Sequence, residues 1–138
     1  MNTQKKALAL ILHSSSYDRL YQGMSCALAA LALGREVKLF FTYWALETLR
    51  KDASNALMLD EEANAHKEIL EKNLKEGHMQ KISELYVQAK TMGAKFYACT
   101  QSMGLLNISR DELVKEVDKS MGLTTFLVEA LEDQILFI

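Results

Sequence analysis

The sequence has no proline, only two cysteines and no dominant sign of charge. Cys26 and Cys99 are too few for a disulfide framework, and their spacing fits no C-x-x-C metal or redox motif. We therefore expect both thiols to be reduced. With 16 Lys and Arg against 18 Asp and Glu, the net charge is −2 and no basic run stands out. This balance argues against nucleic acid as a partner.

Long apolar runs are also missing. The run Ala7 to Leu12 is too short to span a membrane and short even for the apolar part of a signal peptide. We interpret it as a β-strand in a cytoplasmic protein without a membrane span. A glycine-rich phosphate loop, paired catalytic carboxylates and a Ser-His-Asp arrangement are not found, and His66 and His78 match no metal-ligand spacing. We expect neither a metal nor a cofactor.

What the sequence does contain is a regular alternation of short apolar runs with segments of helical period. This alternation is typical of βαβ units, so it predicts an α/β domain with a parallel sheet. The length fits one domain over residues 1–138. The predicted strands are 6–12, 36–42, 94–99 and 134–138, with a shorter one at 117–121.

The predicted helices lie between these strands. Apolar residues recur at helical spacing over 20–32 before Gly34, over 79–89 before Gly93, and again over 122–131. Two pairs, Ser15 with Asp18 and Ser109 with Glu112, have the spacing of a capping box. The charged segment 52–77 differs from the rest, because only Ile69, Leu70 and Leu74 give it an apolar face. We expect it to form a helical insertion at the surface.

In open parallel sheets, ligands bind at the carboxyl ends of the strands. That rule selects three strand ends, whose residues are His13, Ser14, Ser15 and Ser16; Thr42, Tyr43 and Trp44; and Cys99, Thr100, Gln101, Ser102 and the adjoining Met103. A thiol at Cys99 would face the free amides of the following helical turn. Those amides favour a thiolate, so the placement suits a nucleophile.

Several of these side chains have structural alternatives. Cys99 could be a small buried residue that ends a strand, and Cys26 is interpreted as a packing residue of a helix. The other candidates also have structural alternatives. His13 could be a hydrogen-bonded structural histidine, Tyr43 and Trp44 could cap the core, and Ser14 to Ser16 could cap the helix.

Four stretches together resemble the DsrE/DsrF-like sulfur-relay family, particularly its peroxiredoxin-annotated branch. They are "ALILHSSSYDRL", "ALALGREVKLFFTYWALETLRK", "AKTMGAKFYACTQSMGLLNISRDEL" and "GLTTFLVEALEDQILFI". The resemblance implies a five-stranded parallel sheet between helices, trimers or hexamers, and a reactive cysteine at Cys99. We predict a flavodoxin-like three-layer sandwich of strand order 2-1-3-4-5.

The resemblance also implies a function, namely a sulfur carrier or sulfurtransferase that accepts persulfide sulfur at Cys99 and passes it between donor and acceptor proteins. Thr100, Gln101 and Ser102 would supply hydrogen-bond donors at the helix end, and His13, Tyr43 and Trp44 would wall the pocket. The alternative is a non-catalytic oligomeric module of the same fold that binds a small ligand or a partner. A redox or peroxide-reducing role would need an external resolving thiol.

A homo-oligomer is also expected from the helix over 20–32. Beyond its core-facing stripe, it carries further apolar residues: Tyr21, Cys26, Ala29, Ala30 and Leu33. A helix that is apolar most of the way round is buried on more than one side. We therefore predict a second subunit against it, in a trimer before a dimer, with the end of the sheet that carries Cys99 near the subunit boundary.

Overall fold

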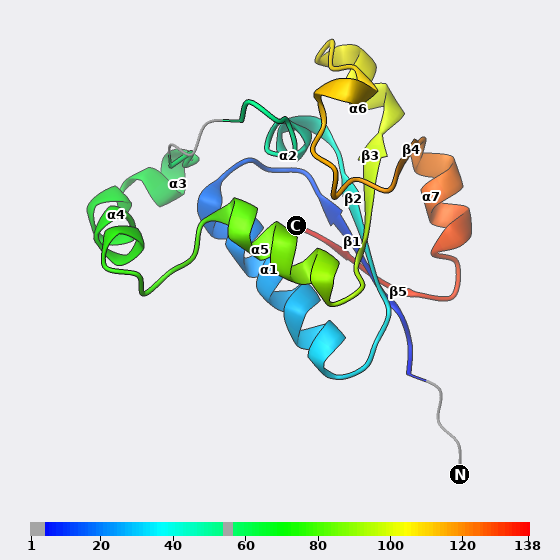
Figure 1. The fold of residues 1–138 in the computed structure, drawn as a ribbon, viewed down its shortest axis with the longest axis horizontal. Coiled ribbons are helices and arrows are strands. Elements are labelled where there is room, and N and C mark those ends of the chain that lie inside the picture. Colours follow the sequence, from blue (N-terminus) through cyan, green and yellow to red (C-terminus); the bar gives the residue numbers. More distant parts are fainter. Residues whose placement is uncertain (1–4, 54–56) are drawn as a thin grey trace.

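The computed structural model describes residues 5–53 and 57–138. Residues 1–4 and positions 54–56 of the expected insertion lie outside the described residues. The centre of the fold is a parallel five-stranded sheet flanked by helices, which confirms the predicted α/β class (Figure 1). The strands are β1 (Leu8–Leu12), β2 (Val37–Phe41), β3 (Lys95–Cys99), β4 (Lys119–Met121) and β5 (Gln134–Phe137).

The helices connect these strands in the predicted alternation. They are α1 (Tyr17–Ala32), α2 (Tyr43–Glu47), α3 (Glu61–Asn64), α4 (Lys67–Lys75), α5 (Ile82–Thr91), α6 (Thr100–Leu105) and α7 (Leu123–Glu129), with a short 3₁₀ turn at Arg110–Glu112. Among the described residues, no helix has the length and apolar character needed to cross a membrane.

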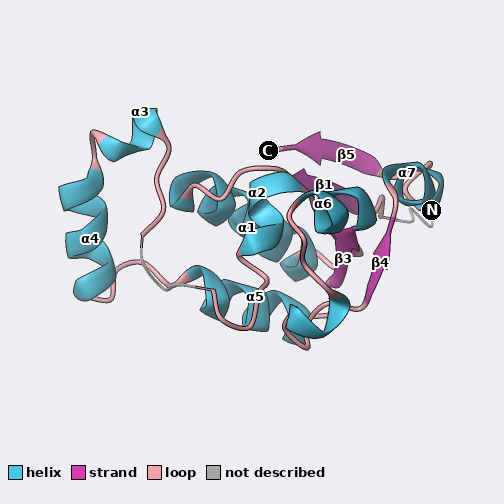
Figure 2. Cartoon of the chain, turned by 90° about the horizontal axis from the view of Figure 1, so that it is seen from above, coloured by secondary structure: helices cyan, strands magenta, loops and turns pink. Residues whose placement is uncertain are grey.

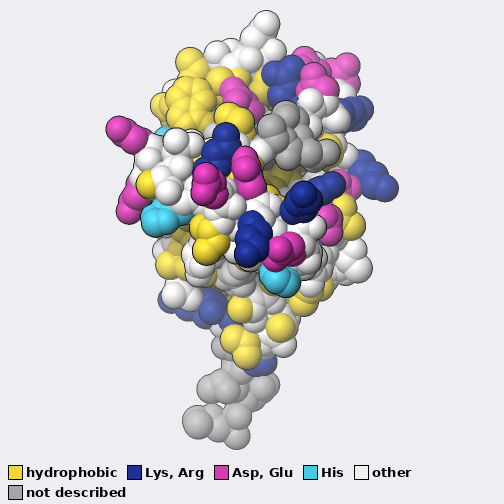
Figure 3. Space-filling model, turned by 90° about the vertical axis from the view of Figure 1, so that its left-hand side faces the viewer, with side chains coloured by type: hydrophobic (Ala, Val, Ile, Leu, Met, Phe, Trp, Pro, Cys, Tyr) yellow, Lys and Arg dark blue, Asp and Glu magenta, His cyan; other side chains and the backbone are white. Residues whose placement is uncertain are grey.

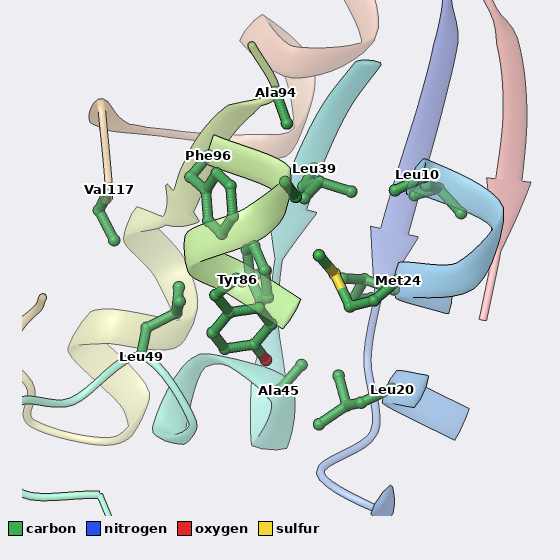
Figure 4. Close-up of a cluster of buried hydrophobic side chains, with 14 of the residues drawn as sticks. Leu10, Leu20, Met24, Leu39, Ala45, Leu49, Tyr86, Ala94, Phe96 and Val117 are labelled. Carbon is green, nitrogen blue, oxygen red and sulfur yellow. The ribbon is translucent and has the colours of Figure 1, made fainter. Parts of the chain in front are cut away.

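The sheet has a core on each face because alternate strand residues point to opposite sides. On one face α1 and α5 pack side by side over the larger core, which includes Leu10, Leu39 and Phe96 (Figures 1 and 4). On the other face α7 covers a smaller cluster: Ala9, Ile11, Phe40, Tyr97, Cys99, Met121, Phe126 and Ala130. Cys99 therefore lies on the α7 face.

The predicted strand order 2-1-3-4-5 is wrong. The observed order is β4-β3-β2-β1-β5, so β1 lies between β2 and β5. Because α1 and α5 pack on the same face and βαβ crossovers are right-handed, the steps from β1 to β2 and from β2 to β3 run in the same direction. The return from β4 to β5 passes through α7 on the opposite face (Figure 2). The carboxyl ends of all five strands still lie along one edge of the sheet.

The helix ends follow the sequence signals in most places. Gly34 and Gly93 both adopt positive φ just after a helix, as predicted for C-terminal glycines. The pair Ser109 and Glu112 forms its capping box, although it opens a 3₁₀ turn instead of an α-helix. At α1 the predicted box is wrong: Ser16 is the N-cap residue, and its hydroxyl donates to Asp18.

The charged excursion that contains α3 and α4 stands out from the body, farthest from α7 in Figure 1. No residue of α4 is buried, and positive and negative side chains lie close together on this side of the molecule (Figure 3). The excursion is tied to the start of α1 by Arg19, whose Nε donates to Asp60 over 2.8 Å. This bond and one from the Ala63 amide hold the pKa of Asp60 below its usual value. Within α4, Lys67 and Glu71 are four residues apart and form an ion pair at 3.8 Å.

Candidate thiol site at the carboxyl edge of the sheet

Cys99 occupies the junction between the sheet and a helix. It is the last residue of β3 and the N-cap residue of α6, so the first amides of α6 follow it directly. Its register partner on β4 is Met121, and the pairing of Phe41 with Ala98 sets the end of β2 on its other side. The thiol therefore lies at the carboxyl end of β3, with β2 on one side and β4 on the other.

The thiol is buried in this conformation. Cys99 is 3% exposed and belongs to the small cluster beneath α7, together with Phe40, Met121 and Phe126. A protein-sized donor cannot reach a thiol at that depth. Any chemistry at Cys99 with a partner therefore requires the edge of the sheet to open locally.

Ser102 links α6 to the end of β2. Its Oγ accepts a hydrogen bond from the backbone N–H of Tyr43 at 2.8 Å and shares another with Thr42 Oγ1 at 2.9 Å. Both hydroxyl residues are buried. The sequence predicted Ser102 as one of the residues that supply donors at the N-terminal end of α6, and its hydroxyl is bonded at the β2–α2 junction.

Tyr43 has a backbone conformation that its side chain disfavours. Its φ is +47°, in the left-handed region where a bulky residue is an outlier. Strain of this kind costs on the order of 1–3 kcal/mol and occurs most often at functional sites. In this conformation the Tyr43 amide donates its hydrogen bond to Ser102.

Aromatic rings gather beside this junction. The Tyr43 ring lies 4.8 Å from the imidazole of His13 and 5.6 Å from the ring of Trp44, and Phe137 lies 5.7 Å from His13 on the other side. Tyr43 and Trp44 are exposed. The ends of β1, β2 and β5 therefore form one aromatic wall.

The remaining predicted residues do not form one group. Ser14 accepts a hydrogen bond from the Ser16 amide in the turn before α1. Thr100 and Gln101 are exposed on α6, whereas Met103 packs partly against the larger core on the opposite face. Cys26 is half-buried in α1 and contacts that same core.

A sizeable cavity lies elsewhere. Its volume is about 670 Å³, and it lies between the charged excursion and the body, where Tyr17, Leu20, Tyr86 and Lys81 contribute to its lining. Burial raises the pKa of Tyr17 to about 12, and the phenol donates to the carbonyl of Gln80. Of the residues selected at the three strand ends, only Ser15 lines this cavity. We place the candidate site at Cys99, because that thiol lies at the strand ends selected from the sequence, whereas no cysteine is among the described residues that line the cavity. In residues 5–53 and 57–138 no set of three or more His, Cys, Asp or Glu side chains is arranged to hold a metal ion.

Two neighbours of the site were not selected from the sequence. Met121 pairs with Cys99 because β4 follows β3 in the sheet, and Phe137 meets His13 because β5 pairs with β1. Both strands were predicted, and the predicted order already placed β4 beside β3, but only the observed order places β5, and with it Phe137, beside β1.

Comparison with known proteins relates the whole chain to one family. The model of the DsrE/DsrF/DrsH-like family matches residues 4–66 and 56–138. The uncharacterized protein YrkE of Bacillus subtilis is 26% identical over 161 aligned positions that cover all of both chains.

Solved structures show the same fold at low sequence identity. The YchN protein of E. coli aligns with a TM-score of 0.68 at 13% identity, over 97% of this chain and all of its own. MTH1491 of Methanobacterium thermoautotrophicum, a protein of unknown function, aligns with a TM-score of 0.65 at 12% identity and the same coverage. These similarities support the fold. Any chemical activity has to be argued from the residues at the site.

Proposed function

The chain belongs to the DsrE/DsrF/DrsH-like family, and on this premise we propose that it is a sulfur carrier that accepts and passes on persulfide sulfur at Cys99. The observation that carries the proposal is the position of Cys99 between the end of β3 and the first turn of α6. The thiolate is the nucleophile in sulfur exchange, and this position lies beside the free amides of the first turn of α6.

The proposed reaction conserves both atoms and electrons. The Cys99 thiolate attacks the outer sulfur of a donor persulfide, so a sulfur–sulfur bond forms at Cys99 while the donor's own sulfur–sulfur bond breaks. The donor leaves as a thiolate, and the proton of the transferred SH group stays with it or exchanges with water. An acceptor thiolate then attacks the outer sulfur of Cys99–S–SH in the same way and restores the Cys99 thiolate. A carrier of this kind needs its thiol reduced, which is why we propose a cytoplasmic location.

Sulfur loading tests this function directly. After incubation with a low-molecular-weight persulfide donor and removal of the excess, we expect the intact mass of the wild-type protein to increase by one sulfur atom. Cys99→Ser should gain none, because its hydroxyl cannot form the persulfide, whereas Cys26→Ser should load like wild type. Equal loading of wild type and Cys99→Ser, or no loading of either, would contradict the carrier role.

A binding module without chemistry is the second candidate. It is favoured by the burial of Cys99 together with the exposure of Tyr43 and Trp44, since exposed aromatic rings are common anchors for a ligand or partner. In that case Cys99 packs in the cluster beneath α7, and the aromatic wall does the binding. Absence of sulfur loading in a folded wild-type protein would favour this candidate.

We further propose that the protein is a homo-oligomer, with a trimer expected before a dimer. The apolar surplus that the sequence indicated on α1 is partly used within the chain, because Tyr21 and Cys26 pack against the core and Ala30 is buried, whereas Ala29 and Leu33 are exposed. A larger exposed apolar surface lies on α7 and β5. This α7–β5 surface consists of Leu123, Leu127, Val128, Leu131, Ile135 and Phe137, each 40–76% exposed. Apolar patches of this kind often mark interfaces.

The α7–β5 surface also reaches the candidate site. Ile135 and Phe137 point to the α7 side of the sheet, because their register partners Ala9 and Ile11 belong to the cluster on that side. Phe137 contacts His13 at the aromatic wall. A subunit seated on this surface would therefore lie beside the sheet edge that carries Cys99.

Charge placed on this surface should separate the subunits. We expect Leu131→Glu with Phe137→Glu to reduce the mass measured by light scattering to the monomer value of 15.6 kDa, because each glutamate would lose its hydration in the interface. Circular dichroism should stay unchanged, since both side chains are exposed in the single chain. Leu33→Glu, at another exposed leucine after α1, is the matched control and should leave the mass as in wild type. A wild-type protein that is monomeric at micromolar concentration would refute the oligomer.

A further inference from the structure

The strained backbone of Tyr43 and its single buried side-chain partner point to a second role for the helix that follows Cys99. Ser102 is 2% exposed, and its hydroxyl is committed to Thr42 and to the amide of Tyr43. None of these bonds is made to Cys99. The hydroxyl therefore joins two elements, α6 and α2, which lie side by side above the sheet (Figure 1).

We propose that Ser102 is a positioning residue that keeps Tyr43 in its left-handed conformation and thereby holds the sheet edge closed over Cys99. The proposal rests on the proposed function for its biological meaning, but its structural content is independent of sulfur transfer. Because φ at Tyr43 is +47°, the backbone would relax to an ordinary conformation if its amide lost the hydrogen bond to Ser102. The ring of Tyr43 would then leave the imidazole of His13.

The position of Ser102 in the chain makes this contact relevant to the thiol. Cys99 and Ser102 lie three residues apart at the first turn of α6, so a displacement of that turn moves both. The thiol itself is buried in the cluster beneath α7, next to the first turn of α6. Releasing α6 from Tyr43 would therefore loosen the turn that carries Cys99 beside β2 and β4. Such loosening is what the 3% exposed Cys99 needs before a donor can reach it.

Three measurements on Ser102→Ala test this role, all with Cys26→Ser as the background so that only Cys99 is labelled. We expect iodoacetamide to label Cys99 about tenfold faster, the factor that corresponds to a loss of 1.4 kcal/mol from the closed state. We expect hydrogen exchange at the Tyr43 amide to accelerate in parallel. The ring protons of His13 should change their NMR chemical shift, because the neighbouring Tyr43 ring has moved.

The matched control is Thr48→Val, which removes another hydroxyl pair, partly buried, in the same part of the chain. Thr48 Oγ1 lies 2.6 Å from the hydroxyl of Tyr86, on the opposite side of the sheet from Cys99. It should destabilise the protein without changing the His13 shift or the Tyr43 exchange. Should Ser102→Ala fail to fold, Thr42→Val removes only the second partner of Ser102 and should give the same changes at a smaller size.

The outcomes separate this role from the function itself. Unchanged His13 and Tyr43 signals in Ser102→Ala, or equal acceleration of labelling in Thr48→Val, would overturn the positioning role whether or not the wild type loads sulfur. A wild type that loads no sulfur would overturn the carrier function, and the three measurements would still decide the role of Ser102.

Discussion

Phe126→Ala is expected to destabilise the protein by about 3–5 kcal/mol, the usual cost of removing a phenylalanine ring from a core. Phe126 is fully buried at the centre of α7, with its ring stacked on Phe40 at a centroid distance of 4.6 Å and edge-on to Tyr97 at 6.1 Å. The smaller cluster has few members, so it cannot fill the space that the ring leaves. Urea denaturation at one fixed protein concentration measures the loss, because oligomer stability depends on concentration.

The same variant should also expose the thiol, since Cys99 shares this cluster with Phe126. We expect its alkylation to become faster in the folded protein. Val87→Ala is the control, because Val87 is an aliphatic residue exposed on α5, and its loss should change the free energy of unfolding by less than about 0.5 kcal/mol. A change below about 1 kcal/mol in Phe126→Ala would show that α7 is not held by this cluster.

Much of the fold could be predicted because its signals are local. The strands follow from short apolar runs, and Gly34 and Gly93 mark the ends of α1 and α5. The strand order could not be predicted in this way. It depends on which face of the sheet each crossover helix covers, and the contact of α1 with α5 joins segments that are far apart in the sequence.

The candidate site shows the same division. The rule that ligands gather at strand ends selected His13, Tyr43 and Cys99 from the sequence alone. The role of Ser102 was not visible, because nothing in the residues around it indicates a bond to the amide of Tyr43. Tyrosine is also a residue type that local preference keeps out of the left-handed region, so only the tertiary structure places it there.

The attachment of α7 to the sheet suggests the second large effect. Lys38 extends from β2 on the α7 face, and its Nζ lies 2.7 Å from a carboxylate oxygen of Asp133 while it also donates to the carbonyl of Glu129 at 3.1 Å. The two charged side chains are only 18% and 9% exposed. Lysine at this position therefore neutralises a nearly buried carboxylate and satisfies the last turn of α7.

Lys38→Met should consequently destabilise the protein by about 3 kcal/mol, the lower end of the range for removing one partner of a buried ion pair. The loss arises because the nearly buried carboxylate of Asp133 is left without its partner. The double variant Lys38→Met with Asp133→Leu removes that carboxylate as well and should recover most of the stability. Lys119→Met is the matched control, since Lys119 pairs with Glu129 of the same helix while its own side chain is 55% exposed. Exposed pairs contribute about 0–1 kcal/mol, so this variant should unfold close to wild type in urea.

Equal losses of stability in Lys38→Met and Lys119→Met would contradict the assignment of a buried pair. A double variant no more stable than Lys38→Met would show that the unpaired carboxylate is not the cause.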